Sequence, residues 1–500
     1  QDVVEWANKY LGPESYAIIY KREGKDPDEQ KIAAPKITPI VTNRDSQSEF
    51  LSEIQTSQVQ PIEPVFVDYK KDMSQFEAQP GIDVLYKKNE TNDIFTLIYV
   101  FNTGTENDPA LNLAFNYLSY LGTDKMTAEE IASEMYDIAC SFYMNAGANQ
   151  SSIQITGLSE NMGKAMEIVE GLIAGAKPDE AILENCKADM LKSRADAKLN
   201  QSRCFGALQR YLFYGGDFIR RTTLTDPALQ ALTSEQLLAK IGDLTGKQHE
   251  VLYYGPQKEA EVKSALAKHH KVAADLQPLE KKFSALLPTD ANKVVLAQYD
   301  AKQLYYLQFS NRGEKFDVAA DPEITLYNEY FGGGMNTIVF QEMREARGLA
   351  YTAWATLATP SNANGDYSYY AFIATQNDKM QKAAEAFDDI INNMPESEKA
   401  FGIAKEALVS RLRTERTVKD GVLWSYLRAR DLGLDAPRDK QIFEKVQSMT
   451  LDDVKAAQQK WVKGRKYVYG ILGDIQDLDL NYLKTLGPIQ TVSQEEIFGY

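Results

Sequence analysis

The sequence is poor in the residues that build metal, redox and disulfide sites. Its 500 residues include only three cysteines and three histidines: Cys140, Cys186, Cys204, His249, His269 and His270. The cysteines are odd in number and show no Cys-x-x-Cys spacing, which excludes a disulfide framework and a thiolate zinc site. His269 and His270 are adjacent, so on a helix they would point in different directions, and no paired glutamate supports them. We therefore expect surface histidines rather than metal ligands.

Long apolar runs and an excess of positive charge are absent as well. The longest obvious apolar run, Ile94–Phe101, has the length of a strand, so we expect no transmembrane segment. The formal net charge of −16 would repel nucleic-acid phosphates, so we expect no nucleic acid as partner. The sequence opens without methionine and without a basic and then apolar leader, which indicates that a targeting segment is absent or removed. The compartment stays open; the bacterial periplasm or cell envelope is one that such a soluble chain fits.

What is present is typical of a globular protein with more than one domain. The apolar fraction is 44% and the charged fraction 25%, which are ordinary values for a folded chain. A chain of 500 residues exceeds the size at which single hydrophobic cores stop growing.

An internal repeat divides the chain. The segment Thr233–Leu237 opens a predicted helix that leads to the predicted strand Val251–Tyr254, and Thr450–Val454 opens another that leads to Val468–Ile471. In both segments a threonine of N-cap type precedes acidic residues in the first turn. The two copies lie 217 residues apart.

Further helices and single residues match at similar offsets. Residues 162–173 and 380–391 both show the apolar stripe of a helix packed on a sheet. Tyr143 falls opposite Tyr351, and Tyr136 falls opposite Arg344. We predict an α+β fold of two homologous domains, each a mainly antiparallel sheet covered by helices. The predicted domains span residues 66–285 and 286–500, with a helix-rich joint near 256–290.

The N-terminal residues predict a separate piece. Residues 3–11 have the pattern of a helix and residues 16–20 that of a strand, the same ending that each repeat shows. We interpret residues 1–22 as the tail of an upstream domain, with a small N-terminal decoration as the alternative. Residues 23–65 predict a linker, because they are polar and contain several prolines, among them Pro35, Pro39, Pro61 and Pro64.

The most informative stretch is Tyr330–Tyr351. Here a helix ends in the glycine-rich turn Gly332–Gly334, which we expect to pack its backbone closely, since no Gly-Lys-Ser/Thr follows for a phosphate loop. A second helix is predicted from about Asn336 to Arg347, ending at Gly348, and a strand follows over 349–357. Arg344 and Tyr351 would then lie close together across a tight turn. A guanidinium and a phenol placed in this way can hold a peptide carbonyl and stabilise a developing oxyanion.

This stretch resembles the C-terminal-domain signature of the pitrilysin-type zinc peptidases, the family that includes insulin-degrading enzyme and the mitochondrial processing peptidases. The resemblance implies four such domains in two halves, with zinc bound by a His-x-x-Glu-His helix in the first half. In this chain that motif would fall on Leu113–Tyr117, where Leu113 and Tyr117 cannot replace histidine ligands and Asn116 cannot act as a base. The resemblance therefore implies no metal on this chain, and zinc on a partner half.

The resemblance also implies the function. Arg344 and Tyr351 would be the substrate-binding and catalytic residues that this half lends to the zinc site of an N-terminal half, located in the same longer chain or in a separate subunit. The substrate would be an unfolded peptide enclosed in a chamber. A last-turn arginine and a strand tyrosine also occur as plain structural residues. The alternative function is therefore an inactive peptide-binding or complex-assembly scaffold of the same fold.

Overall fold

The computed structural model describes the chain except for residues 13–15, 21–23, 25–47 and 59. Its contacts divide it into two compact units, Gln1–Pro61 and Ile62–Tyr500. In the described residues, no helix combines the length and apolar character that a membrane span requires.

The first unit contains helix α1 (Asp2–Tyr10) and helix α2 (Glu49–Thr56). Helix α1 confirms the helix predicted over residues 3–11, whereas α2 lies inside the predicted linker. The strand predicted over residues 16–20 is wrong: these residues form no strand, and Ile19 is 91% exposed. The apolar pattern of residues 16–20 does not by itself specify a strand, because strand formation depends on the context that the fold supplies. Pro35 and Pro39 lie outside the described residues.

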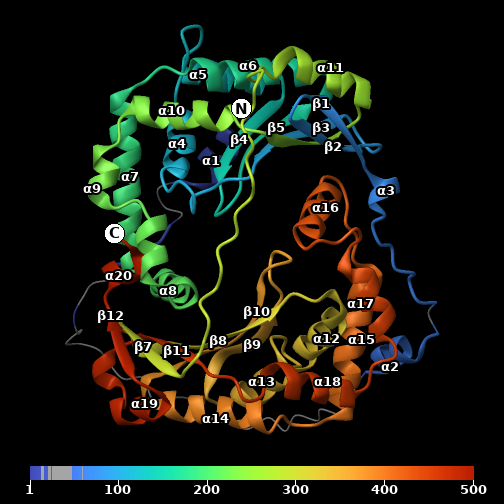
Figure 1. Ribbon diagram of the computed structural model, residues 1–500, viewed down its shortest axis with the longest axis vertical. Helices are drawn as coiled ribbons and strands as arrows, with labels where there is room; N and C mark the ends of the chain where they lie inside the picture. The colour runs from blue at the N-terminus through green and yellow to red at the C-terminus, as the bar shows by residue number, and fades with distance from the viewer. Residues whose placement is uncertain (13–15, 21–23, 25–47, 59) are drawn as a thin grey trace. The chain divides into compact units, whose positions relative to one another are not determined.

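The second unit is built on two mixed six-stranded sheets (Figure 1). The first sheet has the order β1-β2-β6-β3-β5-β4 and is parallel only between β2 and β6. Its strands are β1 (Ser74–Gln79), β2 (Ile82–Lys88), β3 (Ile94–Phe101), β4 (Cys140–Ala146), β5 (Ser151–Leu158) and β6 (His249–Gly255). The accompanying helices are α3 (Tyr69–Asp72), α4 (Leu111–Leu118), α5 (Ala128–Asp137), α6 (Met162–Gly175), α7 (Glu180–Lys198), α8 (Gln201–Thr222), α9 (Asp226–Ala231), α10 (Ser234–Thr245) and α11 (Glu259–His269).

The second sheet repeats this plan with the order β12-β7-β11-β8-β10-β9. Its strands are β7 (Lys293–Gln298), β8 (Gln303–Lys315), β9 (Ala350–Ala358), β10 (Asp366–Gln376), β11 (Val468–Gly473) and β12 (Ile489–Val492). The helices are α12 (Asp321–Phe331), α13 (Ile338–Phe340), α14 (Met380–Asn392), α15 (Glu398–Thr414), α16 (Gly421–Asp431), α17 (Arg438–Val446), α18 (Leu451–Ala457), α19 (Leu480–Leu486) and α20 (Gln494–Phe498). The two sheets differ at one edge. The edge strand β12 of the second sheet runs parallel to β7, whereas the edge strand β1 of the first sheet forms an antiparallel hairpin with β2. The predicted α+β class with two sheet-and-helix domains is confirmed.

The two helices on which the predicted repeat was based both begin at a threonine N-cap. Thr233 caps α10 and exchanges side-chain and backbone hydrogen bonds with Gln236. At α18 the Thr450 amide and hydroxyl both donate to the Asp453 carboxylate, at 2.7 and 3.0 Å. In both helices a side chain three residues on accepts from the N-cap amide. The joint near 256–290 contains less helix than predicted, since α11 is its only helix.

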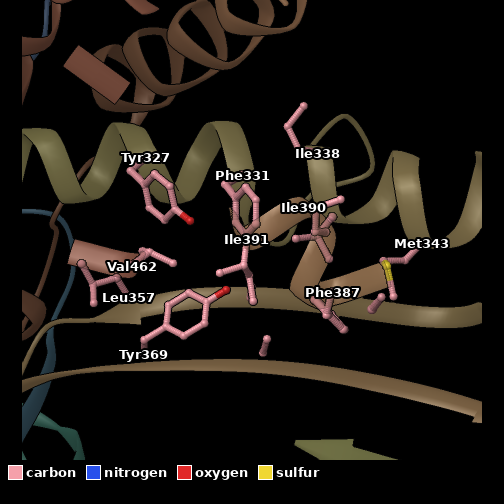
Figure 2. Packing of buried hydrophobic residues seen from close by; sticks show 14 of the residues in the cluster. Tyr327, Phe331, Ile338, Met343, Leu357, Tyr369, Phe387, Ile390, Ile391 and Val462 are labelled. Atoms are coloured by element: carbon pink, nitrogen blue, oxygen red, sulfur yellow. The ribbon is translucent and has the colours of Figure 1, made fainter. Parts of the chain in front are cut away.

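One face of each sheet carries the main core of its domain. In the second domain, aromatic and aliphatic side chains from α12 and α14 meet the inner face of β9 and β10 (Figure 2). Tyr327, Phe331, Phe387 and Tyr369 are completely or almost completely buried there. Burying each such side chain contributes about 1.5–3 kcal/mol to stability. This core fixes the strands on which the candidate site stands.

The opposite face of each sheet is covered by a helix of the other repeat. Leu208 and Leu212 of α8 pack on the second sheet, where Gly470 has no side chain and lies against Leu212. Leu423 and Leu427 of α16 pack on β2, β3 and β6 of the first sheet. The two domains therefore exchange equivalent helices.

Candidate functional site

The helix that carries Arg344 is short and partly of π type. Helix α13 is followed directly by a π-helix over Gln341–Ala346. It begins after Thr337, not at the predicted Asn336, because the Thr337 hydroxyl donates to the Gly334 carbonyl at 2.7 Å and closes the preceding turn. Short π segments are rare and are frequently found at functional sites.

A tight turn then carries the chain into strand β9. Gly348 has φ of 56°, a left-handed conformation that favours glycine, and the Leu349 amide donates to the Met343 carbonyl at 2.9 Å. The Thr375 hydroxyl donates to the Leu349 carbonyl at 2.6 Å and ties the turn to β10. The predicted end of the helix at Gly348 and the predicted strand with Tyr351 near its start are both confirmed.

The turn brings Arg344 and Tyr351 into contact. The Arg344 guanidinium carbon lies 4.6 Å from the centre of the Tyr351 ring and 4.9 Å from that of Phe340. Tyr351 is 74% exposed, and the Arg344 side chain is 35% exposed. A cation over an aromatic face is held by the ring quadrupole. The guanidinium is thereby positioned while its N–H donors remain accessible.

Arg347, three residues after Arg344, forms ion pairs with acidic side chains instead. Arg347 donates to Asp389 at 2.7 Å and lies 3.4 Å from Glu342, so it links the π-helix to α14. This bond lowers the pKa of the Asp389 carboxyl and raises that of Arg347. The only ion pair of Arg344 among the described residues is a 3.5 Å contact with Glu345, its neighbour in sequence. Arg347 therefore links two elements, whereas Arg344 makes no ion pair with another element among the described residues.

The glycine-rich turn fixes the far end of β9. The Ala355 amide donates to the Gly332 carbonyl at 3.1 Å, and Asn328 exchanges two hydrogen bonds of 2.9 Å with the backbone of Leu357. A Cβ on Gly332 would lie 2.5 Å from the Ala355 carbonyl oxygen. The prediction of a turn with close backbone packing is confirmed, and Gly332 and Asn328 bind the outer edge of β9 at Ala355 and Leu357.

The positions on which the resemblance would place the zinc motif, Leu113–Tyr117, carry side chains that pack in the protein core. Leu113 and Tyr117 on α4 are fully buried. The Tyr117 hydroxyl donates to Ser234 Oγ at 2.7 Å and accepts from the Asp179 amide at 2.7 Å, so it joins α4 to α7 and α10. These side chains do not fit a zinc ion, and the described residues hold no cluster of three or more potential metal ligands.

The expectation of surface histidines is wrong for His249 and His270, each only 4% exposed. Their Nε2 atoms lie 2.8 Å apart, His270 Nδ1 lies 2.6 Å from Glu170, and His249 Nδ1 donates to the Lys247 carbonyl at 2.8 Å. Burial and the His270 charge lower the pKa of His249 to about 4, so its Nε2 accepts from His270. The supporting Glu170 is a hundred residues distant in sequence, which explains why no local pattern revealed it.

The counterpart of the candidate pair in the first domain lacks its chemistry. Tyr136 and Tyr143 occupy the matching positions at the end of α5 and on β4, and both are exposed. Two phenols supply no positive charge for a peptide carbonyl. Of the two domains, only the second can present a guanidinium and a hydroxyl together at this place.

Comparison with known proteins finds a family model and relatives that resemble the chain. Residues 244–408 match the family model described as the peptidase M16 inactive domain. The chain is 24% identical over 309 residues to an uncharacterized zinc protease of Rickettsia bellii, a match that covers 60% of this chain and 70% of the relative.

Solved structures share the fold. The peptidase M16 inactive domain from Pseudomonas fluorescens superposes with a TM-score of 0.63 at 18% identity, over 80% of this chain and 98% of that one. The ferredoxin protease FusC, solved in complex with Arabidopsis ferredoxin, gives a TM-score of 0.64 at 13% identity, over 95% of this chain and 50% of that one. The family model, the zinc protease relative and the two-domain fold together support the predicted resemblance to the pitrilysin-type, or M16, zinc peptidases.

Proposed function

We propose that the chain is the C-terminal, substrate-binding half of a zinc-dependent endopeptidase and that it supplies Arg344 and Tyr351 to a zinc site on another half. The observation that carries this proposal is the accessible Arg344 guanidinium, which is held on the Tyr351 ring and not engaged in any ion pair with another element among the described residues. Arginine can bind substrate carbonyls through several N–H donors, and a tyrosine hydroxyl can donate to a tetrahedral oxyanion.

The catalytic metal would belong to the partner half. Leu113, Asn116 and Tyr117 offer neither ligands nor a general base, so this half would contribute substrate binding and oxyanion stabilisation rather than activation of water. The zinc-bearing half could be part of the same longer polypeptide or a separate subunit. An unfolded peptide enclosed between the two halves would be the substrate.

The proposed domain organisation follows the repeat. Residues 66–285 would form the domain with the degenerate zinc motif, and residues 286–500 the domain with the Arg344–Tyr351 pair. Residues 1–22 would be the tail of an upstream domain and residues 23–65 the linker to it. The exposed apolar side chains of Ile18 and Ile19 support a missing neighbour for this tail.

Metal analysis and a fluorogenic peptide assay test the proposal. The purified chain should hold no stoichiometric zinc and hydrolyse no peptide, because it offers no ligand set for the metal. Addition of the zinc-bearing half should produce turnover that neither half shows alone. One tightly held zinc per chain, or hydrolysis by the chain alone, would contradict the proposed division between the halves.

A further inference from the structure

A pocket rich in arginine lies between α7, α8 and the C-terminal residues, and its lining does not include Arg344 or Tyr351. Its volume is about 440 Å³. Three guanidinium groups line it, from Arg194, Arg203 and Arg210, and no carboxylate side chain does. In a chain with a net charge of −16, such a concentration of positive charge is unusual.

Two of these arginines lack a carboxylate at bonding distance. Arg194 is paired with Asp226 and lies over the Tyr500 ring. Arg210 instead donates to the Thr222 hydroxyl at 2.7 Å, and among the described residues neither it nor Arg203 forms an ion pair. Burial lowers the pKa of Arg210, and the charge of Glu106, which lies beyond ion-pair distance, opposes this shift. A half-buried guanidinium without a direct counter-ion favours an anionic ligand.

The pocket continues into a groove beside strand β4. A second pocket of about 490 Å³ shares Asn112 and Met190 with the first. Its other lining residues include Asn116 of α4 and the strand residues Phe142–Asn145. The groove therefore leads from apolar and amide side chains to the arginines.

Strand β4 also offers a free edge to the groove. It is the last strand of the first sheet, and it pairs only with β5 among the described residues. Its counterpart β9 is bound along part of its outer edge by Asn328 and Gly332, whereas the described residues show no such tether on β4. An exposed strand edge presents unpaired N–H and C=O groups that an extended peptide can match.

We propose that this groove binds an extended peptide along β4 and that Arg203 and Arg210 bind a carboxylate of that peptide, from either an acidic side chain or the C-terminus. Arginine matches a carboxylate with two parallel N–H donors, which makes the contact both strong and directional. The inference deepens the proposed function by naming a feature of the substrate, and it rests on that function for the role of the bound peptide.

Fluorescence anisotropy of the full chain with four labelled nonapeptides tests the inference. The peptides share a sequence of serine, valine and threonine, carry one glutamate or one glutamine, and end in a free carboxylate or an amide. The peptide with glutamine and a C-terminal amide should bind at least about tenfold more weakly than the best peptide with a carboxylate. A hydrogen bond to a charged group contributes more to affinity than a bond to a neutral group, by about this factor. Comparing the glutamate peptide that ends in an amide with the glutamine peptide that ends in a free carboxylate shows whether the side-chain or the C-terminal carboxylate is bound.

Variants then locate the site. Arg203→Gln and Arg210→Gln should each reduce the difference in affinity between peptides with and without a carboxylate. Arg203→Gln leaves packing intact because Arg203 is exposed. The control is Arg221→Gln, which makes the same charge change on the same helix but outside the pocket and should keep the difference in affinity. Equal affinities for all four peptides, no binding, or unchanged discrimination in both pocket variants would overturn the inference. Because this binding test uses the chain without a zinc-bearing half, its failure is distinguishable from a failure of the turnover predicted for the assembled halves.

Discussion

At the scale of single residues, two arginines close together in sequence have different surroundings. Arg347 lies three residues from Arg344 yet makes its bonds to Asp389 and Glu342, while Arg344 rests on an exposed ring. The spacing of Arg344 and Tyr351 and the glycine between them were enough to predict that the two side chains would lie together. Their role in catalysis remains a prediction.

The buried histidine pair predicts a specific response to pH. The pKa of His249 is about 4, below the usual 6.5, because burial and the neighbouring His270 disfavour its charged form. Its contribution to stability is therefore complete above about pH 6.5 and is lost as the pH falls toward 4. This difference between the pKa of His249 in the folded chain and its usual value corresponds to about 3 kcal/mol in the free energy of unfolding.

Urea unfolding of the wild-type chain and of His249→Asn between pH 7 and pH 4 measures this response. The variant should be less stable at pH 7, because His270 loses its acceptor, but its stability should fall less steeply on acidification. Parallel pH profiles for the two proteins would show that His249 does not titrate in this range. Sequence alone could not predict this arrangement, since His249 lies on β6, His270 follows α11, and the supporting Glu170 lies on α6.

At the scale of elements, the site depends on a turn that has no room for a side chain. Gly332→Ala would place a Cβ 2.5 Å from the Ala355 carbonyl oxygen and 2.6 Å from that of Asn328. Because both neighbours are backbone atoms, the turn must shift, at a cost of about 1–3 kcal/mol. Such a loss lowers the melting temperature by several degrees.

Gly333→Ala is the matched control, since the nearest atom to its Cβ would be Trp354 Cβ at 3.9 Å. Thermal denaturation should therefore show a clear loss for Gly332→Ala and little change for Gly333→Ala. Equal melting temperatures for both variants would mean that the turn does not hold β9 as the distances indicate.

Helix and strand types were largely predictable because caps, glycines and apolar periods are local signals. Thr233, Thr450 and Gly348 occupy the positions expected of them. The π-helix over Gln341–Ala346 was not predicted, because a π turn keeps the composition of an α-helix and differs only in its hydrogen bonds. The strand predicted over residues 16–20 was wrong because β-propensity depends strongly on tertiary context and does not by itself specify a strand.

At the scale of the whole second unit, the two domains are interlocked through the helices that they exchange. Helix α8 covers the second sheet and α16 covers the first, and Arg430 of α16 makes a two-pronged ion pair with Glu250 of β6 at 2.5 and 2.7 Å. The repeat predicted two similar domains but not this exchange, because an apolar helix face does not specify which sheet it will cover. Only the tertiary packing decides between its own sheet and that of its neighbour.

The decisive measurement compares turnover of the assembled enzyme with and without the Tyr351 hydroxyl. With the zinc-bearing half present, Tyr351→Phe should lower kcat by about 10²–10³ while KM changes little, since an oxyanion donor acts in the transition state. Arg344→Ala should lower kcat and raise KM, and Tyr136→Phe, an exposed tyrosine of the first domain, should behave as wild type. Near-normal kcat/KM in both site variants, with assembly and melting temperature unchanged, would contradict the catalytic role of the pair and favour a scaffold.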